Sequence, residues 1–137
     1  MRLALLTAVV AGALLAPVSL AAPGTSLTVT TWLEGGHGKR SYTLTCAPAA
    51  VRGLPAGAIK PLAACAALRE LGDRLYGESL SRHIAGCNYI QAPRGALVAG
   101  TRNGRRVRVR VDLGACERLL VPAKTLRRIV YWQSSVR

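Results

Sequence analysis

Few side chains in this sequence are typical of a catalytic or metal-binding site. Besides 6 acidic residues there are two histidines and four cysteines: His37, His83, Cys46, Cys65, Cys87 and Cys116. A hydrolase would need a base such as His83 next to an activated nucleophile. The sequence has no G-x-S-x-G, no H-E-x-x-H and no glycine-rich phosphate loop to supply that arrangement. We therefore expect that the chain is not an enzyme.

The first residues predict export from the cell. A positive start, Met1-Arg2, precedes an apolar run over 3–15, and the small residues Ser19 and Ala21 form the pattern of a signal-peptidase site. The run is too short to span a bilayer comfortably, and no cysteine stands at the cleavage point to carry a lipid. We expect a signal peptide over 1–21 and one mature domain over 22–137, secreted to the extracellular space without a membrane anchor.

The cysteines are expected to form disulfides. No C-x-x-C spacing occurs and the two histidines lie far apart in the chain, which argues against a zinc site. An even number of cysteines in a small exported chain is typical of a disulfide framework. Three pairings are open, and the sequential one closes two local loops, each contributing roughly 3 to 4 kcal/mol. We expect no metal ion, no cofactor and no thiol nucleophile.

The stretch CNYIQAP, residues 87–93, places a tyrosine between two restraints. Pro93 fixes its own φ and favours extended geometry in the residue before it. If Cys87 is bonded to Cys116, the other end is fixed as well, and Tyr89 is free to point outward. Such a segment suits a substrate mimic that lies along a protease cleft and is ordered before it binds. The alternative is that Tyr89 is a half-buried strand residue.

Arginines alternate with valines over 105–113, so that Arg106, Arg108 and Arg110 share one face of a strand. With a formal net charge of +13, the chain could contact anionic surfaces or nucleic acid through this face. Aromatic residues, which stack on bases, make up only 4% of the sequence, and no nucleic-acid motif occurs. We expect no nucleic-acid partner. A secreted basic binding domain without inhibitory activity is the alternative interpretation.

Hydrophobic periodicity predicts the elements that position these residues. Period-two patterns and apolar runs predict strands over 26–33, 41–46, 96–101, 105–113 and 127–132. Apolar residues at spacings of three and four predict a helix over 61–71, with Pro61 at its start and Gly72 as its stop.

A weaker pattern predicts a short second helix within 75–84, and 46–60 is expected to be irregular. The predicted fold class is α+β. It consists of an antiparallel sheet of about five strands, with the main helix and the short second helix packed on one face, and two disulfides.

Several motifs occur together along the mature part. They are SLTVT at 26–30, TLTCAP at 43–48, ACAALRELGD at 64–73, Cys87 with Pro93, and a hairpin at 100–104 before a valine-rich strand and Cys116. In this combination the chain resembles the small secreted subtilisin inhibitors of actinobacteria over nearly its whole mature length. The resemblance implies the pairs Cys46–Cys65 and Cys87–Cys116, a homodimer formed through the sheet, and inhibition of secreted serine proteases.

In that family the protease attacks the bond two residues after the third cysteine, which implies the reactive bond Tyr89–Ile90 in this chain. Tyr89 would enter the specificity pocket of a subtilisin-like or chymotrypsin-like enzyme, whereas trypsin would be poorly inhibited. Cleavage would be slow and reversible, because the second disulfide holds the new ends together. The resemblance implies further protease contacts from the rest of the loop, Cys87, Asn88, Gln91, Ala92 and Pro93.

The sequence departs from the family pattern at three positions. Asn88 replaces a frequent proline just before the specificity residue. Gly114 replaces an asparagine whose side chain usually props the loop backbone, and Arg102 replaces a tryptophan of the hairpin. The first two departures predict a loop that is less stiff than in the family.

Overall fold

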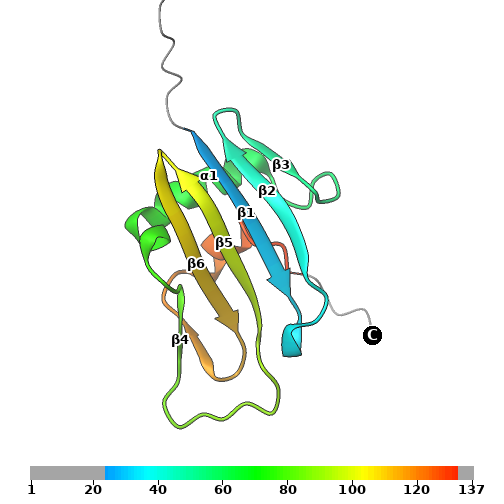
Figure 1. Cartoon of the computed structure of the whole chain (residues 1–137), viewed down its shortest axis with the longest axis vertical. Helices are drawn as coiled ribbons and strands as arrows, with labels where there is room; N and C mark the ends of the chain where they lie inside the picture. Colours follow the sequence, from blue (N-terminus) through cyan, green and yellow to red (C-terminus); the bar gives the residue numbers. More distant parts are fainter. Residues whose placement is uncertain (1–23, 133–137) are drawn as a thin grey trace, which may run out of the picture.

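The computed structural model describes residues 24–132, so the predicted signal peptide over 1–21 lies outside the described residues. An antiparallel sheet in the order β3-β2-β1-β5-β6 dominates this part of the chain (Figure 1). Its strands are β1 Thr25–Trp32, β2 Arg40–Cys46, β3 Ala50–Arg52, β5 Arg94–Arg102 and β6 Arg105–Leu113. A second, two-stranded sheet pairs β4 Ser81–His83 with β7 Glu117–Leu119.

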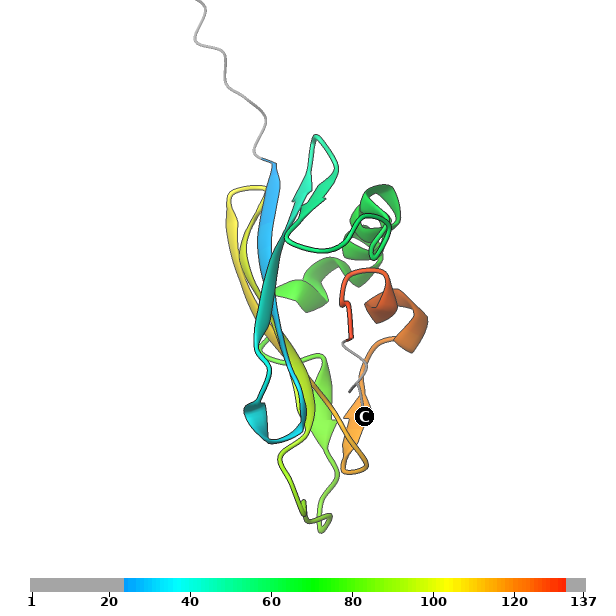
Figure 2. The same ribbon diagram turned by 90° about the vertical axis from the view of Figure 1, so that its right-hand side faces the viewer.

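The helices lie on one face of the large sheet (Figure 2). The main helix α1, Pro61–Leu71, begins at the predicted proline and continues into the 3-10 helix η2, Gly72–Tyr76. Gly72 ends α1 with a φ of 53°, a left-handed value that glycine adopts readily. The short helix α2, Ala123–Arg127, and the 3-10 turn η1, Glu34–Gly36, complete the fold. The predicted α+β class, with its main helix on one face of the sheet, is confirmed.

Strand alternation divides the sheet into a buried and an exposed face. Val29 pairs with Val98, and Val98 pairs with Val109, so these three buried side chains form one row across the inner face. The helices cover this row, and α1 contributes its own buried stripe of Ala64, Cys65, Ala67, Leu68 and Leu71. The outer face is covered by no element of residues 24–132.

The predicted strand over 127–132 is wrong. The chain forms α2, Ala123–Arg127, and then continues without strand pairing, although Ile129 is fully buried. The hydroxyl of Tyr42 holds this part in place: it donates to the Ile129 carbonyl oxygen at 2.6 Å and accepts from the Tyr131 N–H at 2.9 Å. A short apolar run predicts burial, but it does not distinguish a strand from an irregular buried segment.

The short elements differ from the prediction as well. The fifth strand of the large sheet is β3, which lies within the stretch 46–60 that we expected to be irregular. No α-helix forms within 75–84, because η2 ends at Tyr76 and Ser81–His83 is strand β4. Strands of three residues are too short to display the alternation from which a strand is predicted.

The two predicted disulfides are present, in the sequential pairing. Cys46–Cys65 ties the end of β2 to α1 with a Cα–Cα distance of 5.9 Å. Cys87–Cys116 ties the connection before β5 to the connection between β6 and β7, with a Cα–Cα distance of 5.5 Å. Within residues 24–132, no helix has the length and apolar character needed to cross a membrane.

Candidate functional site

The connection between β4 and β5, residues 84–93, protrudes at one end of the molecule (Figures 1 and 2). We call it the 84–93 segment. Its most exposed large side chain is Ile90, at 104% of the reference area, and Tyr89 is 41% exposed. Single exposed apolar side chains are common on folded domains, so the exposure of Ile90 matters here through its place on a protruding segment. The segment contains the sequence CNYIQAP, so the predicted site lies on this protruding end.

The start of the segment is fixed by covalent and backbone bonds. The Cys87–Cys116 disulfide joins it to the connection that follows β6. The Ile84 N–H donates to the Cys116 carbonyl oxygen at 2.8 Å, and the Cys87 N–H donates to the Ile84 carbonyl oxygen at 3.2 Å. Gly86 lies inside this turn with a φ of 78°, which a side chain would disfavour.

The end of the segment is fixed by a different part of the chain. The Gly35 N–H of η1 donates to the Ala92 carbonyl oxygen at 2.8 Å. Pro93 then leads directly into β5 and packs close to Gly114, where an added Cβ would lie 3.1 Å from the Pro93 Cβ. The absence of a side chain at Gly114 therefore lets Pro93 approach the backbone.

The middle of the segment arches over a hollow of about 280 Å³. The hollow is lined by Glu34, Asn88, Tyr89, Ile90, Gln91, Pro93, Gly114, Ala115 and Cys116. Gly114 contributes only backbone to this lining, so no side chain rises from that position to support the arch. The segment is thus held at both ends and open beneath its centre.

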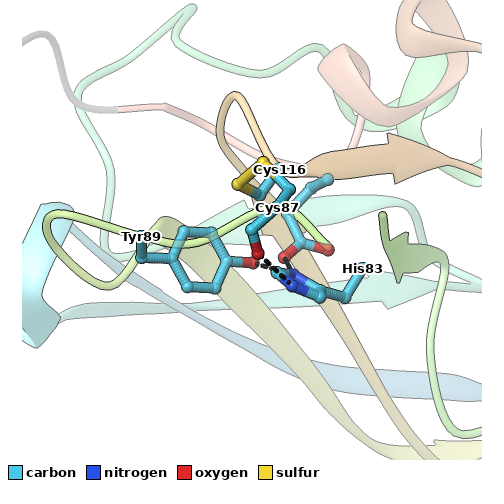
Figure 3. The surroundings of a disulfide bond; sticks show 5 residues. His83, Cys87, Tyr89 and Cys116 are labelled. Atoms are coloured by element: carbon cyan, nitrogen blue, oxygen red, sulfur yellow. Dashed lines mark hydrogen bonds and ion pairs between the residues drawn. A yellow bond between two sulfur atoms is a disulfide. The ribbon is translucent and has the colours of Figure 1, made fainter. Parts of the chain in front are cut away.

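His83 supports the segment from the side (Figure 3). Its Nε2 lies 2.8 Å from the Cys87 carbonyl oxygen, and its Nδ1 lies 2.9 Å from Tyr89 Oη and 3.2 Å from Glu117 Oε1. The imidazole also packs beside the Tyr89 ring, with ring centroids 4.9 Å apart. His83 and Glu117 are direct partners in the β4–β7 pair, which explains their closeness.

The contacts of His83 correct one expectation and add two residues, His83 and Glu117, to the candidate site. Tyr89 is not free to point outward, because its hydroxyl reaches His83, whereas Ile90 is fully exposed. From the sequence, His83 was interpreted only as a candidate base for catalysis, and Glu117 was not identified. One signal could have found both: Glu117 directly follows Cys116, and His83 lies 4 residues before Cys87, so the disulfide brings them together.

The outer face of the large sheet is a second charged region. Arg106, Arg108 and Arg110 are exposed there, as their alternation with buried valines predicts. Arg110 hydrogen-bonds Asp112 at 3.0 Å and stacks over Trp32, 4.9 Å from the ring centroid. A shallow hollow of about 600 Å³ next to them is lined by Thr30, Trp32, Gly36, Lys39, Glu78, Leu97, Arg108 and Arg110.

Within residues 24–132, no group of three or more histidine, cysteine or acidic side chains is arranged to hold a metal ion. Comparisons of the chain with family models, curated proteins and solved structures found no match.

Proposed function

We propose that the chain is a secreted inhibitor of serine proteases that binds them through residues 87–93 in the manner of a substrate. The observation that carries this proposal is the construction of the 84–93 segment: Ile90 is fully exposed, while the disulfide at Cys87 and the Ala92 hydrogen bond fix the chain on either side. The sequence resemblance to subtilisin inhibitors supports the same interpretation.

In the reaction that we propose, the protease cleaves the chain but does not release the two new ends. The protease serine attacks the Tyr89 carbonyl carbon, and the peptide bond to Ile90 breaks with proton transfer to the new amino group. The disulfide keeps the Tyr89 end on the body, and the bond from Gly35 to Ala92 keeps the Ile90 end nearby. Because the amine stays close to the acyl-enzyme, religation at high effective concentration competes with hydrolysis.

The side chain at the reactive bond indicates the class of protease. Tyrosine fits a large apolar specificity pocket, as in subtilisin-like and chymotrypsin-like enzymes, whereas the pocket of trypsin requires a basic residue. We therefore propose secreted proteases of the first kind as partners.

Titration of subtilisin with the wild-type protein and with Tyr89→Gly tests the proposal. The wild type should remove activity with a sharp equivalence point, and the glycine variant should weaken inhibition by about 100-fold or more, since buried aromatic anchors dominate such interfaces. Leu120→Gly changes another exposed apolar residue and is the matched control. Leu62→Gly would not serve, because a glycine in α1 destabilises the helix. Equal inhibition by wild type and Tyr89→Gly would contradict the assignment.

The exposed outer face of the large sheet suits a second function, for which two partners are considered: a second copy of the chain or an anionic molecule. The family resemblance favours a homodimer through this face, where Thr28, Thr43 and Ala99 present small side chains. The exposed Arg106 and Arg108 favour an anionic partner instead. Salt distinguishes the two, because ions screen arginine repulsion in a dimer and weaken contacts with phosphate. Light scattering and oligonucleotide binding at low and high salt give opposite trends for the two partners.

A further inference from the structure

His83 contacts the acyl side of the proposed reactive bond with both ring nitrogens. Nε2 faces the Cys87 carbonyl oxygen at 2.8 Å, and Nδ1 faces Tyr89 Oη at 2.9 Å and Glu117 Oε1 at 3.2 Å. Figure 3 shows the imidazole between the Tyr89 hydroxyl and the Cys87 backbone. One side chain therefore contacts two residues of the segment: Cys87, which the disulfide also anchors, and Tyr89, which lines the hollow.

The partners of the ring determine where its protons lie. A carbonyl oxygen only accepts, so Nε2 carries a proton and donates to Cys87 whether the ring is neutral or charged. In the neutral ring Nδ1 is an acceptor, and the Tyr89 hydroxyl donates to it. In the charged ring Nδ1 donates, and the Glu117 carboxylate is the stronger acceptor because that bond is charge-assisted.

The charged groups around His83 are few in the part of the chain that the structure describes. Glu117 faces it from β7 and Tyr89 from the 84–93 segment. The side chain of Glu117 is only 5% exposed, so water is a poor substitute for His83 as its partner. Arg82 and Arg118 pair one step away in the register, and strand alternation directs their side chains to the other face of the β4–β7 pair.

We propose that His83 is a positioning residue of the reactive segment, which holds the Cys87 carbonyl in both protonation states and the Tyr89 hydroxyl only when the ring is neutral. The inference rests on the proposed inhibitory function. A protease that binds the neutral form must first displace Tyr89 from His83. Protonation gives Nδ1–H to Glu117 and releases the tyrosine, while the contact with Cys87 keeps the backbone ordered.

Association rates with subtilisin between pH 5 and 8, the range in which histidine changes charge, test this device. Tyr89→Phe removes only the hydroxyl, so the protease no longer has to break its hydrogen bond to His83. The variant should therefore associate about fivefold faster than wild type at pH 8, which corresponds to the free energy of one hydrogen bond. The two rates should converge at pH 5. The quantity to compare is the ratio of the Tyr89→Phe rate to the wild-type rate, in which the pH dependence of subtilisin itself cancels. His37→Gln is the matched control because it changes the other histidine.

Cleavage of the Tyr89–Ile90 bond is the second measurement. His83→Ala should be cut about tenfold faster than wild type, since both backbone and hydroxyl contacts are lost. His83→Gln restores a donor near the Cys87 carbonyl, so it should recover slow cleavage without recovering the pH-dependent ratio. If His83 only stabilised the fold, its replacement would lower the unfolding midpoint and leave the ratio of the two association rates unchanged.

NMR of the free protein separates this inference from the proposed function. The signals of the Tyr89 ring and of the His83 ring should change together as the pH is varied, in the wild type and in His37→Gln. If the wild type does not inhibit subtilisin but this coupling is seen, the inhibitory function fails and the contact stands. If the wild type inhibits but the ratio is flat with pH and His83→Ala is cut no faster, the positioning role is overturned.

Discussion

The two disulfides close loops of similar length in regions of very different construction, with sequence separations of 19 and 29 residues. Cys46–Cys65 joins β2 to a helix whose inner stripe is buried against the sheet, and Cys65 itself is 5% exposed. Cys87–Cys116 anchors a segment that is largely exposed and lies over a hollow. The first bond reinforces positions that packing already fixes, whereas the second substitutes for packing that the protruding end lacks.

The largest expected effect comes from removing each disulfide in turn. Cys46→Ala/Cys65→Ala and Cys87→Ala/Cys116→Ala should each lower the free energy of unfolding by roughly 3 to 4 kcal/mol, because the two loops differ little in closure entropy. Only the second variant should be rapidly cut at Tyr89–Ile90 under conditions where both remain folded. Urea unfolding and timed proteolysis measure the two effects. Equal resistance to cleavage would remove the distinction between the two regions.

Glycine substitutions sharpen the contrast between the packed sheet and the segment. Gly100 in β5 has a φ of 146°, and an added Cβ would lie 2.2 Å from the Ser26 carbonyl oxygen. Gly100→Ala should therefore lower stability by about 3 kcal/mol. Gly86 has a φ of 78° but open space around it, so Gly86→Ala should lower it by only about 1 kcal/mol. Denaturant titration measures both, and the reverse ranking would contradict the packing.

Tyr42→Phe tests how the packed side holds the C-terminal segment. The change leaves the Ile129 carbonyl and the Tyr131 N–H without their buried partner, which should lower stability by about 2 kcal/mol. Burial raises the pKa of Tyr42, and the hydrogen bond from Tyr131 opposes that rise only in part.

The raised pKa fixes the sign of a pH dependence. The contribution of Tyr42 to the free energy of unfolding is fully present below about pH 10, the ordinary pKa of tyrosine, and is lost as the pH rises further. The advantage of wild type over Tyr42→Phe should therefore shrink above that pH. Urea midpoints from pH 7 to 11 measure it, and an advantage that grows with pH would contradict the buried, neutral phenol.

The smallest expected effect is at the exposed contact between α1 and α2. A hydrogen bond from Arg128 lowers the pKa of Glu70, which also accepts from Thr125. A lowered pKa means that the contribution is present above the ordinary value of glutamate and is lost as the pH falls. Glu70→Gln should lower the unfolding midpoint slightly at pH 7 and not at pH 3. Glu78→Gln, which changes an acidic residue in the connection before β4, is the matched control.

The sequence predicted those parts of the fold that repeat a pattern over many residues. Over 26–33 and 105–113 the alternation identified β1 and β6, and the spacing of leucines after Pro61 gave the bounds of α1. The strands of three residues were missed, and 127–132 was assigned to a strand, because burial there depends on contacts from distant segments such as Tyr42. The local pattern does not contain those contacts.

The residues of the candidate site also fall into those that the sequence predicted and those that it did not. Cys87, Pro93 and the exposed loop between them could be predicted, because local restraints and an aromatic residue are visible in the sequence. The contacts of His83 were missed: the disulfide indicates that His83 and Glu117 lie near each other, but their contact depends on the pairing of β4 with β7, two strands that are far apart in the chain. That pairing places His83 where the Tyr89 hydroxyl reaches it, whereas Ile90 extends into solvent.

We propose that Tyr89–Ile90 is a reactive bond whose two ends are held close together by the structure around it. Mass spectrometry of equimolar subtilisin and protein, sampled together with residual activity, tests it most directly. Inhibition should last, and intact chain should persist together with chain that is cut only between Tyr89 and Ile90. Complete cleavage with full recovery of protease activity, or inhibition with the first cut at another bond, would contradict it.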